Sequence, residues 1–328
     1  MIWIQKIFKW LLISFASLII LALAGGRIYQ VVSESDDMER YPAPGQLIAV
    51  DDRMMHINCI GQGSPTVIFE LGVGSASAAW SEVHEEVSLF TRACAYDRAG
   101  LGYSEPTDKP LRGSNAAERL QKLLQAAKIE DDLVLVGWSA GGVYIREFYS
   151  RYPEQVAAML FVDSGHEQQA SRMPQTPGNG ADPALRIARY LAPFGLVRLS
   201  GVLDRRVERG ASSDELKSRL KAIYHQSHIL DTVWRESEAF QLDISASQPP
   251  SSLGDLPLIV LTRGIADVSQ EETDARNLLQ RELTLLSING EQIIASESGH
   301  HIYADQPDLL VESVEELVLL VRDRQLVE

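Results

Sequence analysis

The residues best suited to chemistry in this chain lie at Gly137-Trp138-Ser139-Ala140-Gly141, where a serine stands between two glycines with the spacing G-x-S-x-G. An apolar run at 133–136 precedes them and a segment of helical character at 142–148 follows. At such a strand-to-helix turn a serine has a strained backbone and an exposed hydroxyl, and larger residues in place of the glycines would collide across the turn. The N–H groups that begin the helix would face the developing negative charge of an attacked carbonyl. The pattern predicts a nucleophilic serine; the alternative is an ordinary turn of an unrelated α/β protein.

A serine hydroxyl is a weak nucleophile near neutral pH, so Ser139 needs a histidine within hydrogen-bond reach and an acid that orients the histidine. Seven histidines compete for the first role. His166 follows an expected strand and is a candidate for lining the pocket. His225 and His228 are three residues apart on an expected helix, but no cysteine or carboxylate cluster accompanies them, so we expect no metal site.

Length and charge limit the class of protein. The 328 residues suit one large α/β domain with an insertion, or two ordinary domains. The composition is that of a globular protein, with 45% hydrophobic and 23% charged residues and a net charge of −15. Because nucleic-acid binding needs a basic surface, we expect no nucleic-acid partner. The same acidity argues against adsorption of the catalytic domain to anionic lipid, so we expect membrane contact through the N-terminal segment only.

Residues 1–26 have the pattern of a targeting segment. Lys6 and Lys9 precede an uncharged run at 10–26. As a helix this run spans about 25 Å, somewhat less than the hydrocarbon core of a bilayer, and Ala22-Leu23-Ala24 resembles a cleavage site. A signal anchor and a signal peptide released near Ala24 both fit; a buried core helix is the third possibility. Either targeting function exports the main domain across the cytoplasmic membrane, and 27–45 then form a polar tether.

Apolar runs and amphipathic stretches alternate from residue 46 onward. Strands are predicted at 46–51, 53–60, 66–71, 91–96, 133–137, 156–163, 257–262 and 292–296, and helices at 76–90, 114–129, 142–152 and from Pro307. This alternation indicates a mostly parallel sheet with right-handed crossovers. Residues 167–250 interrupt it with helical patterns and no strong strand, and a structureless loop of that length is improbable.

Five motifs in chain order resemble the α/β-hydrolase superfamily. They are the loop Glu70-Leu71-Gly72-Val73-Gly74, the segment 96–104 (YDRAGLGYS), the turn around Ser139, the strand and loop 257–267 (PLIVLTRGIAD), and Gly299-His300 ahead of Pro307. The resemblance implies an α/β-hydrolase fold, a mostly parallel eight-stranded sheet flanked by helices. The core would comprise 46–166 and 251–328, and 167–250 would form a helical lid over the active site.

The resemblance also implies the catalytic residues. Ser139 would be the nucleophile and His300 the general base. Asp267, in the loop after the seventh strand, is the first choice for the acid. Asp163, at the end of the sixth strand, is the alternative, because some relatives carry their acid there. The order serine, acid, histidine along the chain is that of the hydrolases.

Two backbone N–H groups would form the oxyanion hole, one from Ala140 and one from Val73. Many relatives have His-Gly where this chain has Leu71-Gly72, a difference that leaves the donors in place. Trp138 replaces the more common histidine before the serine and is expected to pack beside the turn. In the family, the loop that carries Asp97 and Arg98 is mainly architectural.

A disulfide is a further implication of the resemblance. The family's sheet order places the second strand beside the fourth, so that Cys59 and Cys94 come within disulfide range. Two buried thiols are the alternative.

The implied function is that of a serine hydrolase of the carboxylesterase or lipase type, acting on a small ester-like substrate without a metal or organic cofactor. A lactonase, thioesterase or peptidase would keep the same triad, and the fold does not choose between them. The alternatives are a binding or signalling protein with slow or no turnover, and a membrane-tethered scaffold with an inert pocket. The oligomeric state and the natural substrate do not follow from the sequence.

Overall fold

The computed structural model describes residues 2–130, 132–173, 183–207, 211–246, 250, 252–265 and 269–326. An eight-stranded sheet with the order β1-β2-β4-β3-β5-β6-β7-β8 forms its centre. The pairs β1–β2 and β2–β4 are antiparallel and the other pairs are parallel. The predicted mostly parallel α/β-hydrolase sheet is confirmed. The strands are β1 Gln46–Val50, β2 Arg53–Ile60, β3 Thr66–Glu70, β4 Ala93–Tyr96, β5 Leu133–Trp138, β6 Val156–Val162, β7 Leu258–Arg263 and β8 Gly290–Ala295.

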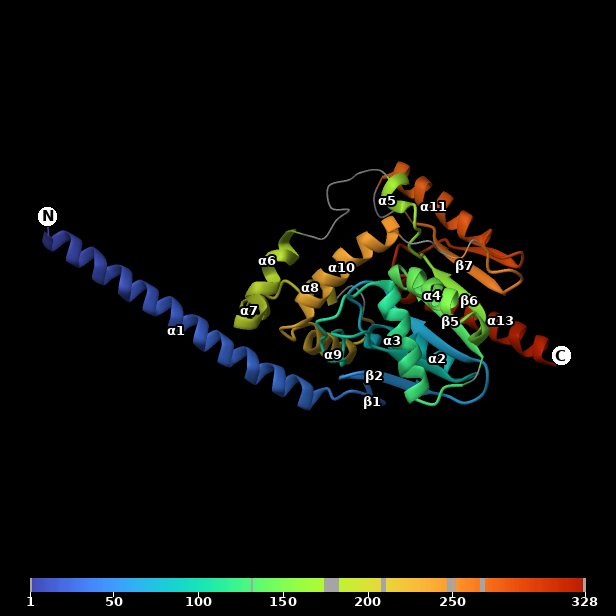
Figure 1. The fold of residues 1–328 in the computed structure, drawn as a ribbon, viewed down its shortest axis with the longest axis horizontal. Helices are drawn as coiled ribbons and strands as arrows, with labels where there is room; N and C mark the ends of the chain where they lie inside the picture. The colour runs from blue at the N-terminus through green and yellow to red at the C-terminus, as the bar shows by residue number, and fades with distance from the viewer. Residues whose placement is uncertain are drawn as a thin grey trace.

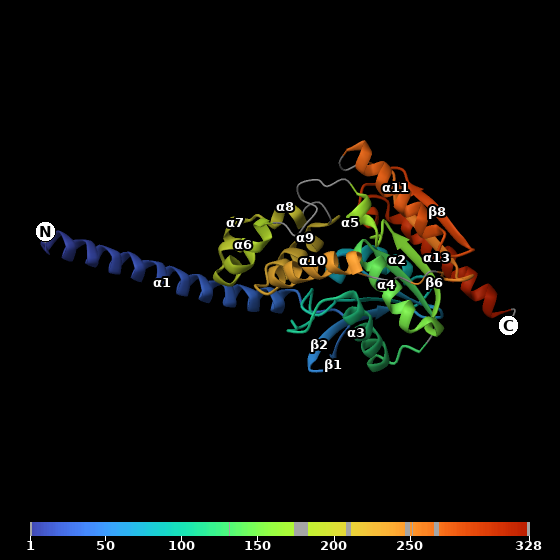
Figure 2. The same cartoon turned by 45° about the horizontal axis from the view of Figure 1, so that its top comes forward.

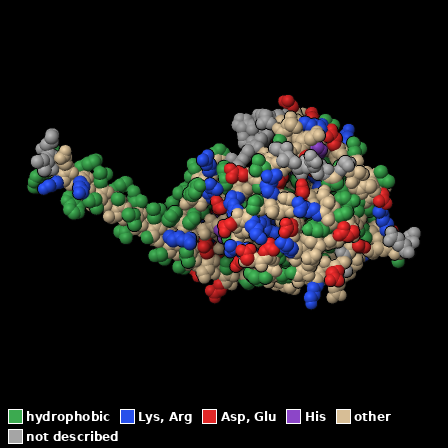
Figure 3. Space-filling model, in the orientation of Figure 1, with side chains coloured by type: hydrophobic (Ala, Val, Ile, Leu, Met, Phe, Trp, Pro, Cys, Tyr) green, Lys and Arg blue, Asp and Glu red, His purple; other side chains and the backbone are tan. Residues whose placement is uncertain are grey.

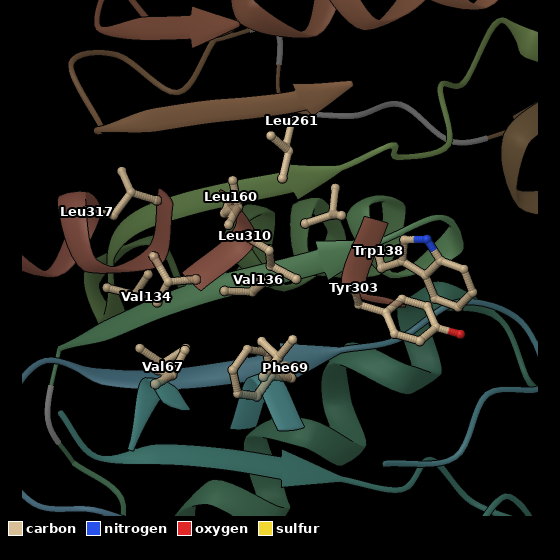
Figure 4. Close-up of a cluster of buried hydrophobic side chains, with 14 of the residues drawn as sticks. Val67, Phe69, Val134, Val136, Trp138, Leu160, Leu261, Tyr303, Leu310 and Leu317 are labelled. Atoms are coloured by element: carbon tan, nitrogen blue, oxygen red, sulfur yellow. The ribbon is translucent and has the colours of Figure 1, made fainter. Parts of the chain in front are cut away.

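Helices cover both faces of the sheet because the central strands are apolar on both sides. One face packs against α2 and α13 through Val67, Phe69, Val134 and Val136. Figure 4 shows these side chains together with Leu310 and Leu317 of α13. Their neighbours along each strand, including Ile68, pack on the other face against α3, α4 and α11. The helices are α2 Ser81–Val87, α3 Gly113–Ala126, α4 Ala140–Arg151, α11 Gln270–Thr284, α12 Ile302–Asp305 and α13 Pro307–Gln325, with the short 3-10 helices η1 Ser77–Trp80 and η2 Pro153–Gln155.

Residues 167–250, which interrupt the alternation of strands and helices, lie in the connection from β6 to β7. Most of its described residues are helical, and Figure 1 shows α6 to α9 together at one side of the body while α5 lies beside α11. We call this region the lid region. Its helices are α5 Gln169–Arg172, α6 Pro183–Leu191, the 3-10 helix η3 Ala192–Phe194, α7 Leu196–Ser200, α8 Asp204–Val207, α9 Asp214–Tyr224 and α10 Ile229–Ala246.

The N-terminal helix is longer than the apolar run suggested. Helix α1, Ile2–Arg40, continues without a break through most of the predicted tether. Its first part projects away from the body, and Trp3–Arg40 is long and apolar enough to cross a membrane. Its last part contacts the lid region: Gln30 is 1% exposed and donates to the carbonyl of His225 at 2.7 Å. A polar sequence was therefore not enough to predict a flexible tether, because contacts with distant helices stabilise it as a helix.

The predicted disulfide is confirmed. Cys59 on β2 and Cys94 on β4 are directly opposite each other in the antiparallel pair, and their sulfur atoms are bonded. The bridge joins two neighbouring strands next to the loop that carries Asp97 and Arg98.

Candidate active site

Ser139 lies at the turn between β5 and α4. Its φ of 56° and ψ of −120° are unusual for a residue with a side chain. The flanking glycines make this turn possible. A Cβ on Gly137 would lie 2.7 Å from the Cα of Gly142, and one on Gly141 would lie 2.0 Å from the carbonyl oxygen of Glu70. The collision across the turn that the spacing predicts is present at Gly137, whereas at Gly141 the neighbouring strand β3 leaves no room for a side chain.

His300 lies beside the serine. Its Nε2 is 3.2 Å from the Oγ of Ser139, and a quarter of its side chain is exposed. Trp138 helps to hold the histidine loop, because its indole N–H donates to the carbonyl of His300 at 2.9 Å. The two rings are 5.0 Å apart, and Tyr303 packs edge-on against the same indole. Trp138 thus packs beside the turn, as expected, and in addition holds the backbone of His300.

The carboxylate that contacts His300 in the described structure is that of Asp163. Its Oδ2 is 2.5 Å from the Nδ1 of His300, and the residue is fully buried at the end of β6. The first-choice acid of the sequence analysis, Asp267, lies outside the described residues. Its assignment stays a prediction, and the geometry favours the alternative, Asp163.

Arg263 is a residue that sequence reasoning did not single out. It ends β7, is 5% exposed, and donates to the Oδ2 of Asp163 through Nε at 2.7 Å and Nη2 at 2.5 Å. Burial by itself would raise the pKa of Asp163, but the hydrogen bond and charge of His300 and the guanidinium of Arg263 hold that pKa well below its usual range. Asp163 therefore stays ionised. The sequence feature that could have identified Arg263 is an arginine at the carboxyl end of a buried parallel strand.

The two predicted oxyanion donors belong to two segments that meet at the serine. Ala140 begins α4, so its N–H has no acceptor within the helix. Val73 lies on the loop after β3, which approaches Ser139 closely: a Cβ on Gly72 would be 3.0 Å from the Cβ of Ser139. The next residue, Gly74, has a φ of +69°, which glycine adopts without strain.

A buried charge network fixes the loop after β3, residues 71–75, which we call the oxyanion loop because it carries the predicted donor Val73. Arg98 donates to the carbonyls of Leu71 and Gly72 at 2.7 Å each, and to Glu70 at 2.6 Å. Glu236, from α10 of the lid region, accepts from Arg98 Nε at 2.7 Å and from the N–H of Gly74 at 2.6 Å. The loop after β4 is thus architectural, as expected.

Burial and neighbouring charges shift the pKa values of Arg98 and Glu70. Burial alone would lower the pKa of Arg98, but the charges of Glu236 and Glu70 raise it well above its usual range. Burial raises the pKa of Glu70, which also accepts a hydrogen bond from the hydroxyl of Tyr96. A permanent cation therefore links the oxyanion loop to a carboxylate of the lid region.

His56 forms a second buried pair on the far side of this loop. Its Nδ1 is 2.7 Å from the carboxylate of Asp97, and its Nε2 is 2.5 Å from the carbonyl of Pro44. Asp97 also accepts from the N–H groups of Ser77 and Tyr103. Because both ring nitrogens meet acceptors and the ring is fully buried, the pair is structural: it joins the segment after α1 to the core.

Comparison with known proteins identifies the family. The model of the alpha/beta hydrolase family matches residues 67–313. The chain belongs to the alpha/beta hydrolase family. Among curated relatives of this hydrolase, the uncharacterized protein YbdG of Bacillus subtilis is 24% identical over 325 residues, covering 97% of this chain and 98% of the relative. An AB hydrolase superfamily protein of Gibberella zeae is 26% identical over 283 residues, covering 79% of this chain and 87% of its own.

Solved structures share the fold of this hydrolase. Est816, described as an N-acyl homoserine lactone degrading enzyme, has a TM-score of 0.61 and 19% identity, covering 83% of this chain and 99% of its own. A thermophilic esterase from Thermogutta terrifontis has a TM-score of 0.59 and 16% identity, covering 84% of this chain and 97% of its own. At these identities the likeness establishes the α/β-hydrolase fold.

Proposed function

We propose that this protein is a serine hydrolase that cleaves an ester-like carbonyl substrate through an acyl-enzyme. The observation that carries the proposal is the continuous chain from Ser139 Oγ to His300 Nε2 at 3.2 Å and from His300 Nδ1 to Asp163 Oδ2 at 2.5 Å. In this proposal Ser139 is the nucleophile, His300 the general base and Asp163 the acid that orients it.

The proposed reaction has two steps. His300 takes the hydroxyl proton as Ser139 attacks the carbonyl carbon, and the N–H groups of Val73 and Ala140 donate to the oxyanion. The imidazolium then gives this proton to the leaving alkoxide, which departs as the alcohol. In the second step His300 takes a proton from water, the hydroxide attacks the acyl-enzyme, and Ser139 regains its proton as the acid leaves. Asp163 keeps its charge throughout and stabilises the imidazolium.

Carboxylic esters are the substrate class that relatives support. The structural neighbours include an enzyme described as degrading N-acyl homoserine lactones and an esterase. A pimeloyl-[acyl-carrier protein] methyl ester esterase of Shewanella woodyi is 30% identical over 110 residues, covering 34% of this chain and 40% of its own. All three names describe action on an ester or a cyclic ester, which the proposed triad can attack without a metal ion.

We further propose that α1 anchors the hydrolase, with the catalytic domain on the exported side of the membrane. Lys6 and Lys9 precede the apolar stretch, and positive charge favours the cytoplasmic side. The Cys59–Cys94 bridge is consistent with export, since disulfides persist in oxidising compartments. Because α1 continues as one helix to Arg40 and its last part contacts the lid region, we favour the anchor form over a cleaved signal.

The test is covalent labelling of the full chain with a fluorophosphonate, together with turnover of p-nitrophenyl esters. Wild type should label at one serine and turn over, and Ser139→Ala should do neither. Ser150→Ala is the matched control, because its hydroxyl lies on the same helix and donates only to the carbonyl of Arg146 among the described residues. The hydrolase proposal fails if Ser139→Ala labels as well as wild type does. Labelling with almost no turnover would favour a ligand-binding protein instead.

A further inference from the structure

The lid region exposes apolar side chains on α6 and α7, two helices that lie near α1 in Figure 1. Six large hydrophobic residues on α6 and α7 and just beyond lie uncovered in a stretch of sixteen positions. We call them the apolar platform: Ile187 (63% exposed), Tyr190 (62%), Leu191 (39%), Leu196 (44%), Leu199 (67%) and Val202 (47%). Ile187, Tyr190 and Leu191 share one side of α6, and Leu196 and Leu199 share one side of α7, because within each helix they lie three or four residues from the first of the set. Contiguous apolar surface of this kind marks an interaction site.

The platform lies directly beside α1. A Cβ on Gly26 would be 2.4 Å from the carbonyl oxygen of Phe194, and one on Gly195 would be 2.8 Å from the ring of Tyr29. Arg27 reaches the carbonyl of Pro193 at 3.4 Å. Figures 1 and 2 both show α6 and α7 alongside α1, at the end of the body nearest the projecting part of that helix. In Figure 3 the hydrophobic surface of α1 continues onto this end of the body.

The length of α1 sets the level at which the platform lies. Between Lys9 and Glu34 the helix carries one charged residue, Arg27. About 20 helical residues span a hydrocarbon core of about 30 Å, so a core that begins at Trp10 ends near Tyr29. Gly26 and Tyr29 are the residues that η3 and the start of α7 touch. The apolar platform is therefore level with the outer boundary of the hydrocarbon core.

The charge of this segment differs from that of the rest of the chain. Residues 183–203 hold three arginines, Arg186, Arg189 and Arg198, and no acidic residue, although the whole chain has a net charge of −15. Arg186 is exposed, while Arg189 is paired with Asp231 of α10 at 3.2 Å and Arg198 with Asp37 of α1 at 2.7 Å. Exposed apolar residues with basic neighbours fit the interface of an anionic bilayer, where apolar side chains enter the acyl boundary and arginines stay among the headgroups.

We propose that the apolar platform docks on the surface of the bilayer that α1 crosses, so that the lid region lies in the headgroup layer. The proposal rests on the proposed anchoring by α1. It extends the membrane contact beyond the N-terminal segment, to which the overall acidity of the chain had confined it. Since α10 packs on α6 and also supplies Glu236 to the oxyanion loop, the docked helices are continuous with the catalytic centre.

The experiment places fluorescent probes on the full chain in vesicles of phosphatidylcholine and phosphatidylglycerol. Both native cysteines are in the disulfide, so single cysteines can be labelled with a polarity-sensitive dye. Ile187→Cys and Leu199→Cys report on the platform. Leu285→Cys and Ile288→Cys are matched controls, because these residues are 79% and 84% exposed and follow α11, far from α1 in Figure 1. Leu18→Cys, on α1, reports on the anchor itself.

The platform probes should be quenched at least threefold more by lipids with a spin label near the headgroup than the control probes are. Aqueous iodide should show the reverse order. Equal iodide quenching at platform and control positions would overturn the proposal, and so would platform probes shielded from both quenchers, which would mean that protein covers the surface. If the Leu18→Cys probe also fails to meet lipid, the anchoring proposal fails with it. Fluorophosphonate labelling of the same samples reports separately on the hydrolase.

Discussion

Replacing Asp163 by asparagine separates the two candidate acids. An asparagine in the same place can turn its NH₂ group toward Nδ1 of His300, which then becomes an acceptor. The proton moves to Nε2, the nitrogen that must take the proton of Ser139, so the base carries the wrong tautomer. By analogy with serine proteases the loss in kcat is about 10⁴-fold, which corresponds to about 5.5 kcal/mol of transition-state free energy. KM should change little, because Asp163 is fully buried and does not line the surface.

The same substitution has a cost in stability that must be measured separately. Arg263 is 5% exposed and directs two N–H groups at Asp163, so Asp163→Asn leaves its charge without that carboxylate. Removing one partner of a buried pair is destabilising, so the unfolding free energy should fall. The double variant Asp163→Asn/Arg263→Met removes both charges and should recover most of this stability while kcat stays low.

The assay is turnover of a p-nitrophenyl ester, normalised to folded protein by urea unfolding. Asp267→Asn is the comparison, because Asp267 is the competing acid. The assignment predicts a loss of about 10³–10⁴-fold in kcat for Asp163→Asn and less than tenfold for Asp267→Asn. The reverse pattern, with folded Asp163→Asn close to wild type, would refute the assignment of the acid.

Three further predictions concern the supports of the site. Glu236→Gln keeps the shape of the side chain but removes the negative charge that accepts hydrogen bonds from Arg98 and Gly74. We expect kcat to fall about tenfold with KM nearly constant. Glu238→Gln, on the same helix, should change neither. Gly141→Ala would place a methyl group 2.0 Å from the carbonyl oxygen of Glu70 and should lower the unfolding free energy by about 3 kcal/mol, while Gly25→Ala, with open space around it, should not. The lowered pKa of Asp163 stabilises the fold above the pKa of an unfolded aspartate, about 3.9, and this contribution is lost as pH falls toward the folded value. Urea unfolding between pH 5 and pH 3 should therefore show a shallower loss for Asp163→Asn/Arg263→Met than for wild type, and equal slopes would contradict the pairing.

The sequence predicted those parts of the fold and site that depend on neighbouring residues. The turn at Ser139 followed from its glycines, because the collisions that exclude a Cβ involve the same strand–turn–helix unit and the adjacent strand. The sheet followed from the alternation of apolar runs and amphipathic helices. The disulfide pairing followed from the order of strands in the family that the chain resembles.

The remaining features depend on contacts between distant segments. Asp163 and Asp267 each come shortly after a predicted strand, and the sequence does not say which of them meets His300. Arg98 and Glu236 are 138 positions apart, and only the packing of α10 against the oxyanion loop brings them together. The end of α1 was predicted to be a tether because its residues are polar. Their partners are lid residues that lie far along the chain, so the sequence does not reveal these contacts.

The most direct test of the proposed mechanism is to trap the acyl-enzyme. Wild type is mixed with a p-nitrophenyl ester, quenched in acid within milliseconds, digested and analysed by mass spectrometry. We predict that the peptide containing Ser139 gains the mass of the acyl group, with a burst of p-nitrophenol of about one per enzyme. A burst with the acyl group on another residue, or steady turnover by Ser139→Ala at the wild-type rate, would contradict the account.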